Sequence, residues 1–482
     1  MSKSKKIRLI AYVSIFFLLG GIITPLQANT PNNEPLGIES FDLLIIAPST
    51  FATDLQPLVD HKNSMGMDTV LVTLEHLRTL PETRDGRDDA EKMKYYIKHA
   101  IETFGITYVL LVGGKMGQKD TWYLPVRYVN MDNSWESRYI TDLYFADIYD
   151  ASGGFSSWDS NNNGIYGEWV EGDIPMDSNI HLYPDISIGR LPCRSRSEVD
   201  TVVEKIIIYE TTTTKTGWFK NMVAIAGDTY LESDNPLWVG YEGEHYADQA
   251  LSYMIQFNPI RLYLSDGTLT GSQDVIDAYN AGCGFVYFVG HGNPRTWGNH
   301  PPNDHEFVNG LQNNEMKNLQ NNGEYPVCIV SGCHNCQFDV GLISILHGLQ
   351  EQGIGYFQTP GGHFWRSEWA PQCWGEKMTN QKGGGSIVTY GATALGHTKE
   401  DKEVSFAGGI NELEVEMFRQ YGQLGIDHAG DLLKHAITWY LDTYPVDWSS
   451  DDEIVRKETW VDVQVAQSYI LLGDPSLLIG GY

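Results

Sequence analysis

The sequence of 482 residues carries 62 acidic and 33 basic side chains, a net charge of −29, and 42% of its residues are hydrophobic. A chain of this length has room for two or three domains, and its apolar content can fill their cores. A strongly acidic protein is repelled by nucleic acids and by anionic membrane surfaces, so both are excluded as partners.

The first 28 residues have the features of an export signal. Four basic residues precede an apolar run from about Leu9 to Leu26, and "LQA" before Asn29 is an acceptable cleavage site. An uncleaved anchor is the alternative, and no later segment has the roughly 20 apolar residues that a membrane span needs. We predict a signal peptide at 1–28, a short leader at 29–40, and a protein that is secreted or held at the cell surface, without membrane contact after cleavage.

Strand-like and helical segments alternate from residue 41 onward. The apolar run "FDLLIIAPSTF" (41–51) is followed by an amphipathic helix and by a second strand, "DTVLVTL" (68–74). Another helix closes at Gly105, directly before the apolar strand "ITYVLLVGG" (106–114). This alternation predicts an α/β fold with mostly parallel sheets flanked by helices.

A loop-rich stretch follows, and its segment "DSNNNGIYGEW" has the first half of a calcium-binding loop. Side-chain oxygens at alternating positions, then a glycine and a backbone carbonyl, are the pattern of such loops. The usual glutamate at position 12 is missing, because Val170 stands there. A turn without an ion is the alternative. The predicted ligands of a structural Ca²⁺ are Asp159, Asn161, Asn163, the carbonyl of Ile165 and Glu168, with Glu171 or Asp173 as substitutes for Glu168.

The threonine-rich segment "TTTTKTG" (211–217) is the predicted linker between two halves of the chain. Beyond it, strands such as "MVAIAG", "CGFVYFVG" and "PVCIVSG" again alternate with helices. We therefore predict two α/β subdomains side by side. The N-terminal one spans 41–216 and includes the calcium loop, and the C-terminal one spans 217–482 and carries the candidate catalytic residues.

Two neighbouring apolar strands end in reactive side chains. "GFVYFVGHG" places His291 after one strand, and "YPVCIVSGC" places Cys333 after the next. Each residue alone is more often structural, but the carboxyl ends of parallel strands form the usual catalytic crevice of an α/β sheet. An imidazole beside a thiol accepts its proton and stabilises the thiolate. The N–H groups of Gly292 and Cys333 can then hold the oxyanion of a tetrahedral intermediate, so the pair predicts acyl transfer.

The motif "CHNC" that begins at Cys333 leaves other chemistry open. As a redox pair, Cys333 and Cys336 would stand unusually late in the chain, and a zinc site would need a partner motif that is missing. Cys336 is then either a spectator or bonded to Cys373. A thiol oxidoreductase remains an alternative, in which Cys336 is as important as Cys333.

Several segments, taken in order, resemble one family. They are "FDLLIIAPSTF", "ITYVLLVGG", "YPDISIGRLPCRSRSEVDTVVEKIIIYE", "VGHGNPRTWG", "SGCHNCQFD" and "LLGDPSLLI". The ordered set is similar to the gingipain-type cysteine peptidases, which are peptidase family C25 in the caspase-like clan CD, and it covers most of the chain after the signal. The resemblance implies a caspase-like fold, with mostly parallel sheets flanked by helices and two subdomains.

The same resemblance implies the roles of the site residues. His291 is the expected proton acceptor, Cys333 the nucleophile, and the N–H groups of Gly292 and Cys333 the oxyanion hole. Asp142 in "ITDLYFADI" is the candidate for a third catalytic carboxylate, with a loop-capping role as the alternative. The expected activity is that of a secreted cysteine endopeptidase, which cleaves protein or peptide substrates through a thioester and needs no organic cofactor.

Specificity for a basic P1 residue is suggested by the resemblance alone. In gingipains an acidic residue a few positions before the "IGR" strand provides it, and His181 stands at the matching place here, with Asp177 and Asp185 nearby. Two further alternatives stay open. One is a transpeptidase that passes the acyl group from the same dyad to an amine, and the other is a catalytically silent surface or adhesion module.

Overall fold

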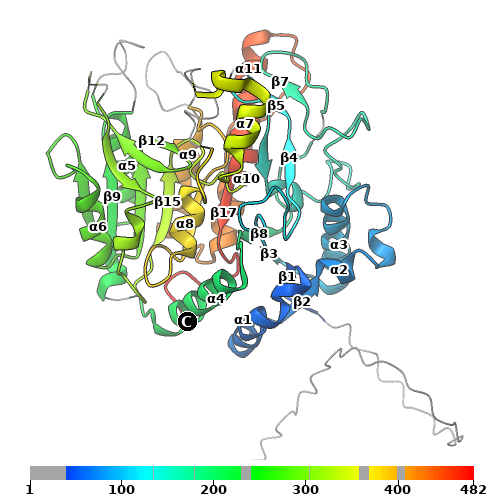
Figure 1. The fold of residues 1–482 in the computed structure, drawn as a ribbon, viewed down its shortest axis with the longest axis horizontal. Coiled ribbons are helices and arrows are strands. Elements are labelled where there is room, and N and C mark those ends of the chain that lie inside the picture. Colours follow the sequence, from blue (N-terminus) through cyan, green and yellow to red (C-terminus); the bar gives the residue numbers. More distant parts are fainter. Residues whose placement is uncertain are drawn as a thin grey trace, which may run out of the picture. The chain divides into compact units, whose positions relative to one another are not determined.

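A ten-stranded β-sheet runs through the part of the chain that the computed structural model describes (Figure 1). That part comprises residues 40–133, 135–178, 180–215, 217–229, 240–302, 304, 306–357, 368–398 and 408–482. The predicted signal peptide, the leader up to residue 39 and the boundary residue Thr216 lie outside it. No helix within these ranges is long and apolar enough to cross a membrane.

The strand order is β10-β9-β11-β15-β16-β17-β8-β3-β1-β2. Strands β16 and β17 pair antiparallel, whereas the other neighbours pair parallel. The sheet therefore has two parallel halves that run in opposite directions. Because of this reversal, the carboxyl ends of the two halves lie at opposite edges of the sheet.

Each half of the sheet takes its strands mainly from one half of the chain. The C-terminal half contains β9 (Asn221–Ala226), β10 (Asn258–Tyr263), β11 (Phe285–Val289), β15 (Val327–Ser331) and β16 (Val388–Ala392). The N-terminal half contains β1 (Leu43–Ala47), β2 (Thr69–Thr73), β3 (Tyr108–Val112) and β8 (Ser187–Leu191), completed by β17 (Tyr469–Leu472). The two predicted subdomains thus contribute to one continuous sheet. Their boundary at 216–217 stays a prediction.

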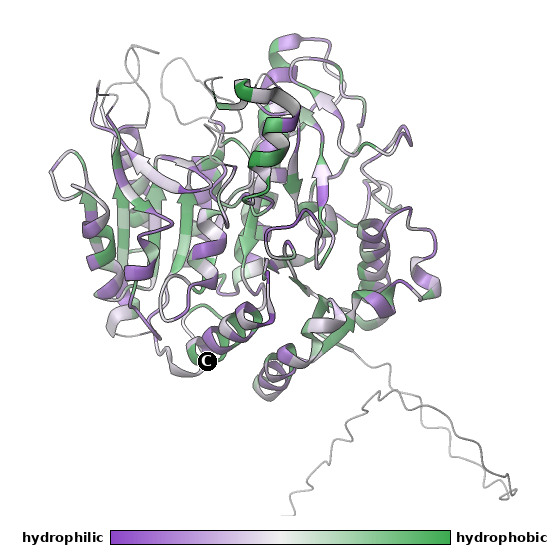
Figure 2. Cartoon of the chain, viewed as in Figure 1, coloured by the Kyte–Doolittle hydropathy of each residue, from purple (hydrophilic) through white to green (hydrophobic). Residues whose placement is uncertain are grey.

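Helices flank the sheet, as the sequence predicts. In the C-terminal half, α5 and α9 pack on one face and α6 and α8 on the other, so successive residues of β9, β11 and β15 enter two different apolar clusters. Figure 2 shows these strands coloured as hydrophobic and the helices as mixed. The helices are α1 (Ala52–Met65), α2 (Leu74–Leu77), α3 (Asp89–Phe104), α4 (Arg196–Thr212), α5 (Glu242–Tyr253), α6 (Ser272–Asn280), α7 (Ser344–Gln352), α8 (Trp374–Asn380), α9 (Ile410–Gly422), α10 (Ala429–Thr443) and α11 (Glu453–Ser468).

The ends of α3 illustrate how local chemistry sets these elements. The Asp88 carboxylate accepts a hydrogen bond from the N–H of Glu91 (2.8 Å), which satisfies a donor of the first helical turn. Gly105 ends the helix with a φ of 71°, a conformation that glycine adopts at little cost. The predicted closure of this helix at Gly105 is confirmed.

A small antiparallel sheet follows the carboxyl end of β11. It contains β12 (His291–Asn293), β13 (Thr296–Asn299) and β14 (Val308–Gln312), in that order. Because β12 begins two residues after β11 ends, His291 lies at the corner between the large and the small sheet.

Candidate active site

The structure brings His291 and Cys333 to matching places at one edge of the sheet. Strands β11 and β15 are parallel neighbours in which Val289 pairs with Ser331, and the N–H of Gly290 donates to the Ser331 carbonyl (3.2 Å). His291 and Cys333 each follow two residues after this last registered pair. They therefore leave the same edge side by side, as the sequence predicts from their places after neighbouring strands.

The backbones of the two loops approach each other closely. A Cβ atom added at Gly332 would lie 3.1 Å from both Cα and N of Gly292, and a Cβ at either glycine would overlap Oδ1 of Asn335. Any larger residue would push the loops apart, which explains the glycine before Cys333 and the glycine after His291. The two predicted oxyanion donors, the N–H groups of Gly292 and Cys333, belong to these touching segments.

Asn335 ties the two loops together and was not identified from the sequence. Its Nδ2 donates to the carbonyls of Asn293 (2.8 Å) and Thr296 (3.1 Å), which flank the turn between β12 and β13. The side chain is fully buried, and its Oδ1 has no hydrogen-bond partner within the described part of the chain. Because both hydrogen bonds from this buried amide go to one turn, they fix that turn against the Cys333 loop. The signal in the sequence was the Asn between the two cysteines of "CHNC", a motif that was interpreted through its cysteines alone.

Cys333 rests as a neutral thiol. Its Sγ accepts a hydrogen bond from the N–H of Gly396 (3.3 Å), and its own N–H also faces the sulfur. Burial nevertheless raises the pKa of the Cys333 thiol, and the negative charge of Glu136 raises it further. Cys333 as a residue is partly exposed, whereas the other five cysteines are buried.

His291 rests as a neutral imidazole. Its Nε2 lies 2.7 Å from the carbonyl of Thr229, which can only accept, so Nε2 carries the proton and Nδ1 is the basic nitrogen. Burial, with a smaller contribution from the neighbouring His300 ring stacked at 5.6 Å, lowers the pKa of His291 to about 4. Above that pH, Nδ1 can accept a proton.

Asp142 has another partner. It follows β6 (Tyr139–Thr141), and its carboxylate accepts from Nε (2.8 Å) and Nη2 (2.7 Å) of Arg190 on β8. Both side chains are buried, and none of the contacts of the described residues joins Asp142 to His291 or Cys333. These contacts give Asp142 a structural ion pair, and its predicted catalytic role finds no support in them.

The side chain of Cys336 packs in the protein interior. It is fully buried, and a Cβ at Gly375, near the start of α8, would lie 2.5 Å from its Sγ. All six cysteines are free thiols, so Cys336 is not bonded to Cys373. Within the described residues, no group of three His, Cys, Asp or Glu side chains could hold a metal. The spectator interpretation of Cys336 therefore fits this environment best.

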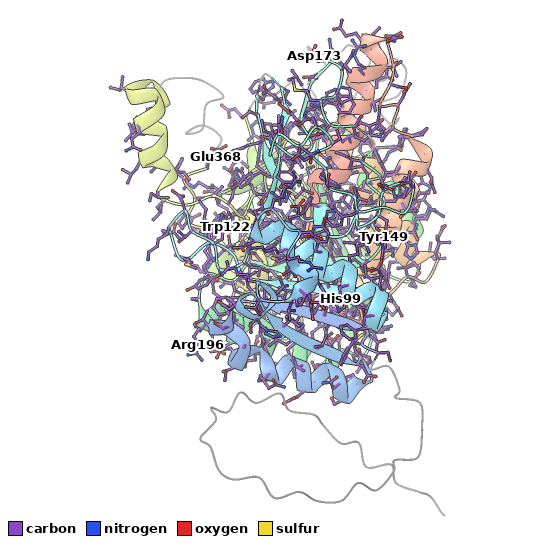
Figure 3. All side chains as sticks on the ribbon, turned by 90° about the vertical axis from the view of Figure 1, so that its right-hand side faces the viewer. His99, Trp122, Tyr149, Asp173, Arg196 and Glu368 are labelled. Carbon is purple, nitrogen blue, oxygen red and sulfur yellow. The ribbon has the colours of Figure 1, made fainter. Side chains whose placement is uncertain are left out.

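A pocket of about 340 Å³ lies beside Cys333, and we call it the acidic pocket. Glu136 lines it and also acts electrostatically on the Cys333 thiol. His334, the residue after Cys333, lines it too, with its Nε2 3.6 Å from Glu136. The carboxylates in its wall are Asp132, Glu136, Asp339 and Glu368, against one arginine, Arg138. Glu368 is labelled in Figure 3, on the side from which α7 projects.

The predicted calcium ligands share one turn-rich loop. The two carboxylate oxygens of Asp159 accept from the N–H groups of Asn163 and Gly164 (3.0 Å each). Nδ2 of Asn163 donates to Glu168 (2.8 Å). Arg87, two residues before the start of α3, also pairs with Asp159. The predicted ligand atoms are all oxygens, which fits Ca²⁺. In this structure Arg87 supplies the positive charge at Asp159.

The other two predicted ligands lie in the same turns. Oδ1 of Asn161 accepts from the N–H of Asn163 (2.9 Å), and the N–H of Ile165 donates to Oδ1 of Asn163 (2.7 Å). Gly164 adopts a φ of 84°, which allows the chain to turn sharply between them.

Comparison with known proteins gives a consistent result. The sequence model of peptidase family C25 matches residues 38–479. Gingipain R2 of Porphyromonas gingivalis is 24% identical over 304 residues, which cover 62% of this chain and 33% of that protein. An uncharacterized protein of Archaeoglobus fulgidus is 24% identical over 265 residues, covering 52% of this chain and 54% of its own length. The match spans about a third of the length of gingipain R2 and a quarter or less of the length of gingipain R1.

Solved structures show the same likeness. The crystal structure of the Arg-specific cysteine proteinase gingipain R superimposes with a TM-score of 0.59 at 18% identity, covering 94% of this chain and 80% of that chain. A complex of the pro- and mature domains of RgpB from P. gingivalis gives 0.58 at 17% identity, covering 91% and 79%. The predicted caspase-like α/β fold is thereby confirmed.

Removing the Asn335 amide is expected to destabilise the protein. Asn335→Ala should lower the free energy of unfolding by about 2 to 4 kcal/mol, because two partly buried carbonyls lose their donor and the site of the fully buried Asn335 amide is left empty. Urea unfolding followed by tryptophan fluorescence measures this. Asn309→Ala on β14, where the side chain is exposed, is the matched control. Equal stabilities of the two variants would contradict the role given to Asn335.

Proposed function

The chain belongs to peptidase family C25, and we propose that it is a cysteine endopeptidase in which Cys333 attacks and His291 accepts the proton. The observation that carries the proposal is the matching position of these residues after the paired strands β15 and β11. A thiol and an imidazole at adjoining strand ends are the groups that nucleophilic acyl transfer requires. Its substrates are proteins or peptides, and the basic and apolar composition of residues 1–28 supports export from the cell.

The proposed reaction begins with proton transfer from the Cys333 thiol to Nδ1 of His291. The sulfur then bonds to the carbonyl carbon of the scissile peptide, and the N–H groups of Gly292 and Cys333 donate to the resulting oxyanion. The His291 imidazolium returns its proton to the leaving amine as the C–N bond breaks, which leaves a thioester on Cys333. Water, activated by the neutral imidazole, hydrolyses the thioester.

The carbonyl of Thr229 supports this cycle through one hydrogen bond. It accepts from Nε2 of His291, and this bond favours the protonated imidazole because it raises the pKa of His291 against the effect of burial. The bond also fixes the ring so that Nδ1, and not Nε2, is the nitrogen that receives the proton. Thr229 thus positions the base without contacting the substrate.

Preference for a basic P1 side chain is the proposed specificity. Four carboxylates and one arginine line the acidic pocket beside Cys333, so a cationic side chain gains attraction there that a neutral one lacks. His181, which stands where gingipains carry their acidic specificity residue, packs its ring against Tyr183 at 4.8 Å and does not line the pocket. The acidic pocket supports basic specificity by a different set of residues.

We also propose that Ca²⁺ binds the loop from Asp159 to Glu168. The carboxylates of these two residues, the amide oxygens of Asn161 and Asn163, and the carbonyl of Ile165 would hold the ion. The ion would supply the positive charge that Arg87 gives to Asp159 in this structure. Its role would be structural, since it would stabilise a loop that carries few apolar side chains.

Replacing the nucleophile tests the activity directly. Cys333→Ala is expected to lower kcat/KM on a fluorogenic peptide library by on the order of 10³-fold or more, because no thioester can form. Cys336→Ala should retain most activity, since that thiol only packs. Equal losses in both variants would favour an oxidoreductase, and an unchanged Cys333→Ala variant would favour a silent surface module. Amide products formed with an added amine would reveal transpeptidation.

Neutralising the acidic pocket should reduce P1 discrimination. Glu136→Gln keeps the acceptor for the N–H of Leu395 but removes the charge. The ratio of kcat/KM for arginine over citrulline at P1 is expected to fall about tenfold, equal to about 1.4 kcal/mol. Asp447→Asn, in an exposed turn, is the control. A ratio near one in the unmodified protein would disprove basic specificity.

Calcium is expected to raise the thermal unfolding temperature. An ion that binds only the folded state at 100 times its Kd stabilises it by about 2.7 kcal/mol. Scanning calorimetry with millimolar Ca²⁺ and with EDTA measures the shift, which Asn161→Ala should reduce and Asn309→Ala should leave intact. Identical unfolding temperatures in Ca²⁺ and EDTA would show that Arg87 alone serves this loop.

A further inference from the structure

A second pocket, of about 380 Å³, adjoins the acidic pocket, and we call it the cationic pocket. Trp369 lines the cationic pocket, while the preceding residue, Glu368, lines the acidic one. Arg295, at the turn between β12 and β13, and Lys377 on α8 contribute two positive charges to its wall. No acidic side chain is among the described residues that line it.

Neither cation forms an ion pair with the residues that the structure describes. The Arg295 guanidinium forms no ion pair and no side-chain hydrogen bond within the described part of the chain, and it lies 3.9 Å over the ring of Trp369. Burial lowers the pKa of Arg295, and no carboxylate offsets this effect. The Lys377 ammonium likewise forms no ion pair with the residues described. Two uncompensated cations facing one pocket, in a chain of net charge −29, produce a local positive potential.

Other groups in the wall suit a peptide better than a free anion. The Oδ1 of Asn313 is buried and has no hydrogen-bond partner among the described residues, while its Nδ2 donates to the carbonyls of Pro294 (3.1 Å) and Gln372 (2.9 Å). An unpartnered acceptor calls for an N–H donor, which a peptide backbone carries and a simple anion lacks. Trp369 and Leu342 add apolar surface for the methylene groups of a side chain.

We propose that the cationic pocket is a substrate subsite for an acidic side chain, glutamate or aspartate, of the polypeptide being cleaved. This inference rests on the proposed function and deepens it. Arg295 can bind a carboxylate through two parallel N–H donors while Trp369 holds the guanidinium plane, and Lys377 adds a second charge. Because the two pockets adjoin, a chain that carries a basic and an acidic residue a short distance apart can fill both.

The position of Arg295 couples this subsite to the nucleophile. Arg295 lies four residues after His291, within the turn whose carbonyls at Asn293 and Thr296 bind Asn335. The turn that carries the subsite cation is thus the one fixed against the Cys333 loop. A substrate carboxylate held by Arg295 would therefore be placed at a defined distance from the sulfur.

Paired peptides test the subsite. Internally quenched peptides with arginine at P1 carry glutamate or glutamine at each position flanking the scissile bond. At the position whose side chain enters the cationic pocket, the glutamate peptide is expected to have a kcat/KM at least tenfold higher than that of the glutamine peptide. That ratio should fall to near one in Arg295→Gln and decrease in Lys377→Gln. Lys317→Gln, which removes an exposed cation on another loop, is the control and should keep the ratio.

A binding assay separates failure of the subsite from failure of the proteolytic function. The Cys333→Ala variant is titrated with fluorescent glutamate and glutamine peptides, so a preference for glutamate that Arg295→Gln abolishes supports the subsite even without cleavage. A preference that Arg295→Gln leaves unchanged, or no preference at any position, overturns it. Competition by glutarate without any preference between the peptides would indicate a small-anion site and would also overturn it.

Discussion

The parallel pairing of β11 with β15 is the constraint on which the site depends. Hydrogen bonds between these two strands bring Val289 beside Ser331, and the residues that follow leave the sheet together. A shift of register by one residue would turn each side chain of the shifted strand to the other face of the sheet. His291 and Cys333 would then no longer stand at matching positions after a registered pair. The close approach of Gly292 to Gly332 and the bonds of Asn335 extend this registration beyond the sheet into the two loops.

Because of the reversal between β16 and β17, the two halves of the sheet contribute different parts of the candidate site. Because the N-terminal half runs the other way, its strands end at the opposite edge and supply no candidate nucleophile or base. Its contribution comes from the long insertion between β3 and β8, which carries Glu136 and the other N-terminal walls of the acidic pocket. The C-terminal half thus carries the proposed catalytic pair, and the insertion in the N-terminal half forms part of the acidic pocket.

Much of this arrangement was predictable from local signals. Apolar runs marked the strands, Gly105 marked a helix end, and strand-terminal His291 and Cys333 marked the edge. The continuous sheet was not predictable, because β17 pairs with β8 from almost 280 residues away and a short apolar run does not reveal its neighbour. The Arg190 partner of Asp142 and the amide bonds of Asn335 depend on tertiary approach, which spacing along the chain does not encode.

The neutral resting state of the Cys333 thiol has a chemical consequence for the proposed exported peptidase. Peroxide attacks thiolates, and oxidised cysteine beyond the sulfenic acid is not readily recovered. A sulfur that stays protonated until it transfers its proton to His291, as in the proposed reaction, presents little of the vulnerable thiolate to such oxidants. The same burial that raises the pKa of the Cys333 thiol would therefore protect the proposed nucleophile from oxidation outside the cell.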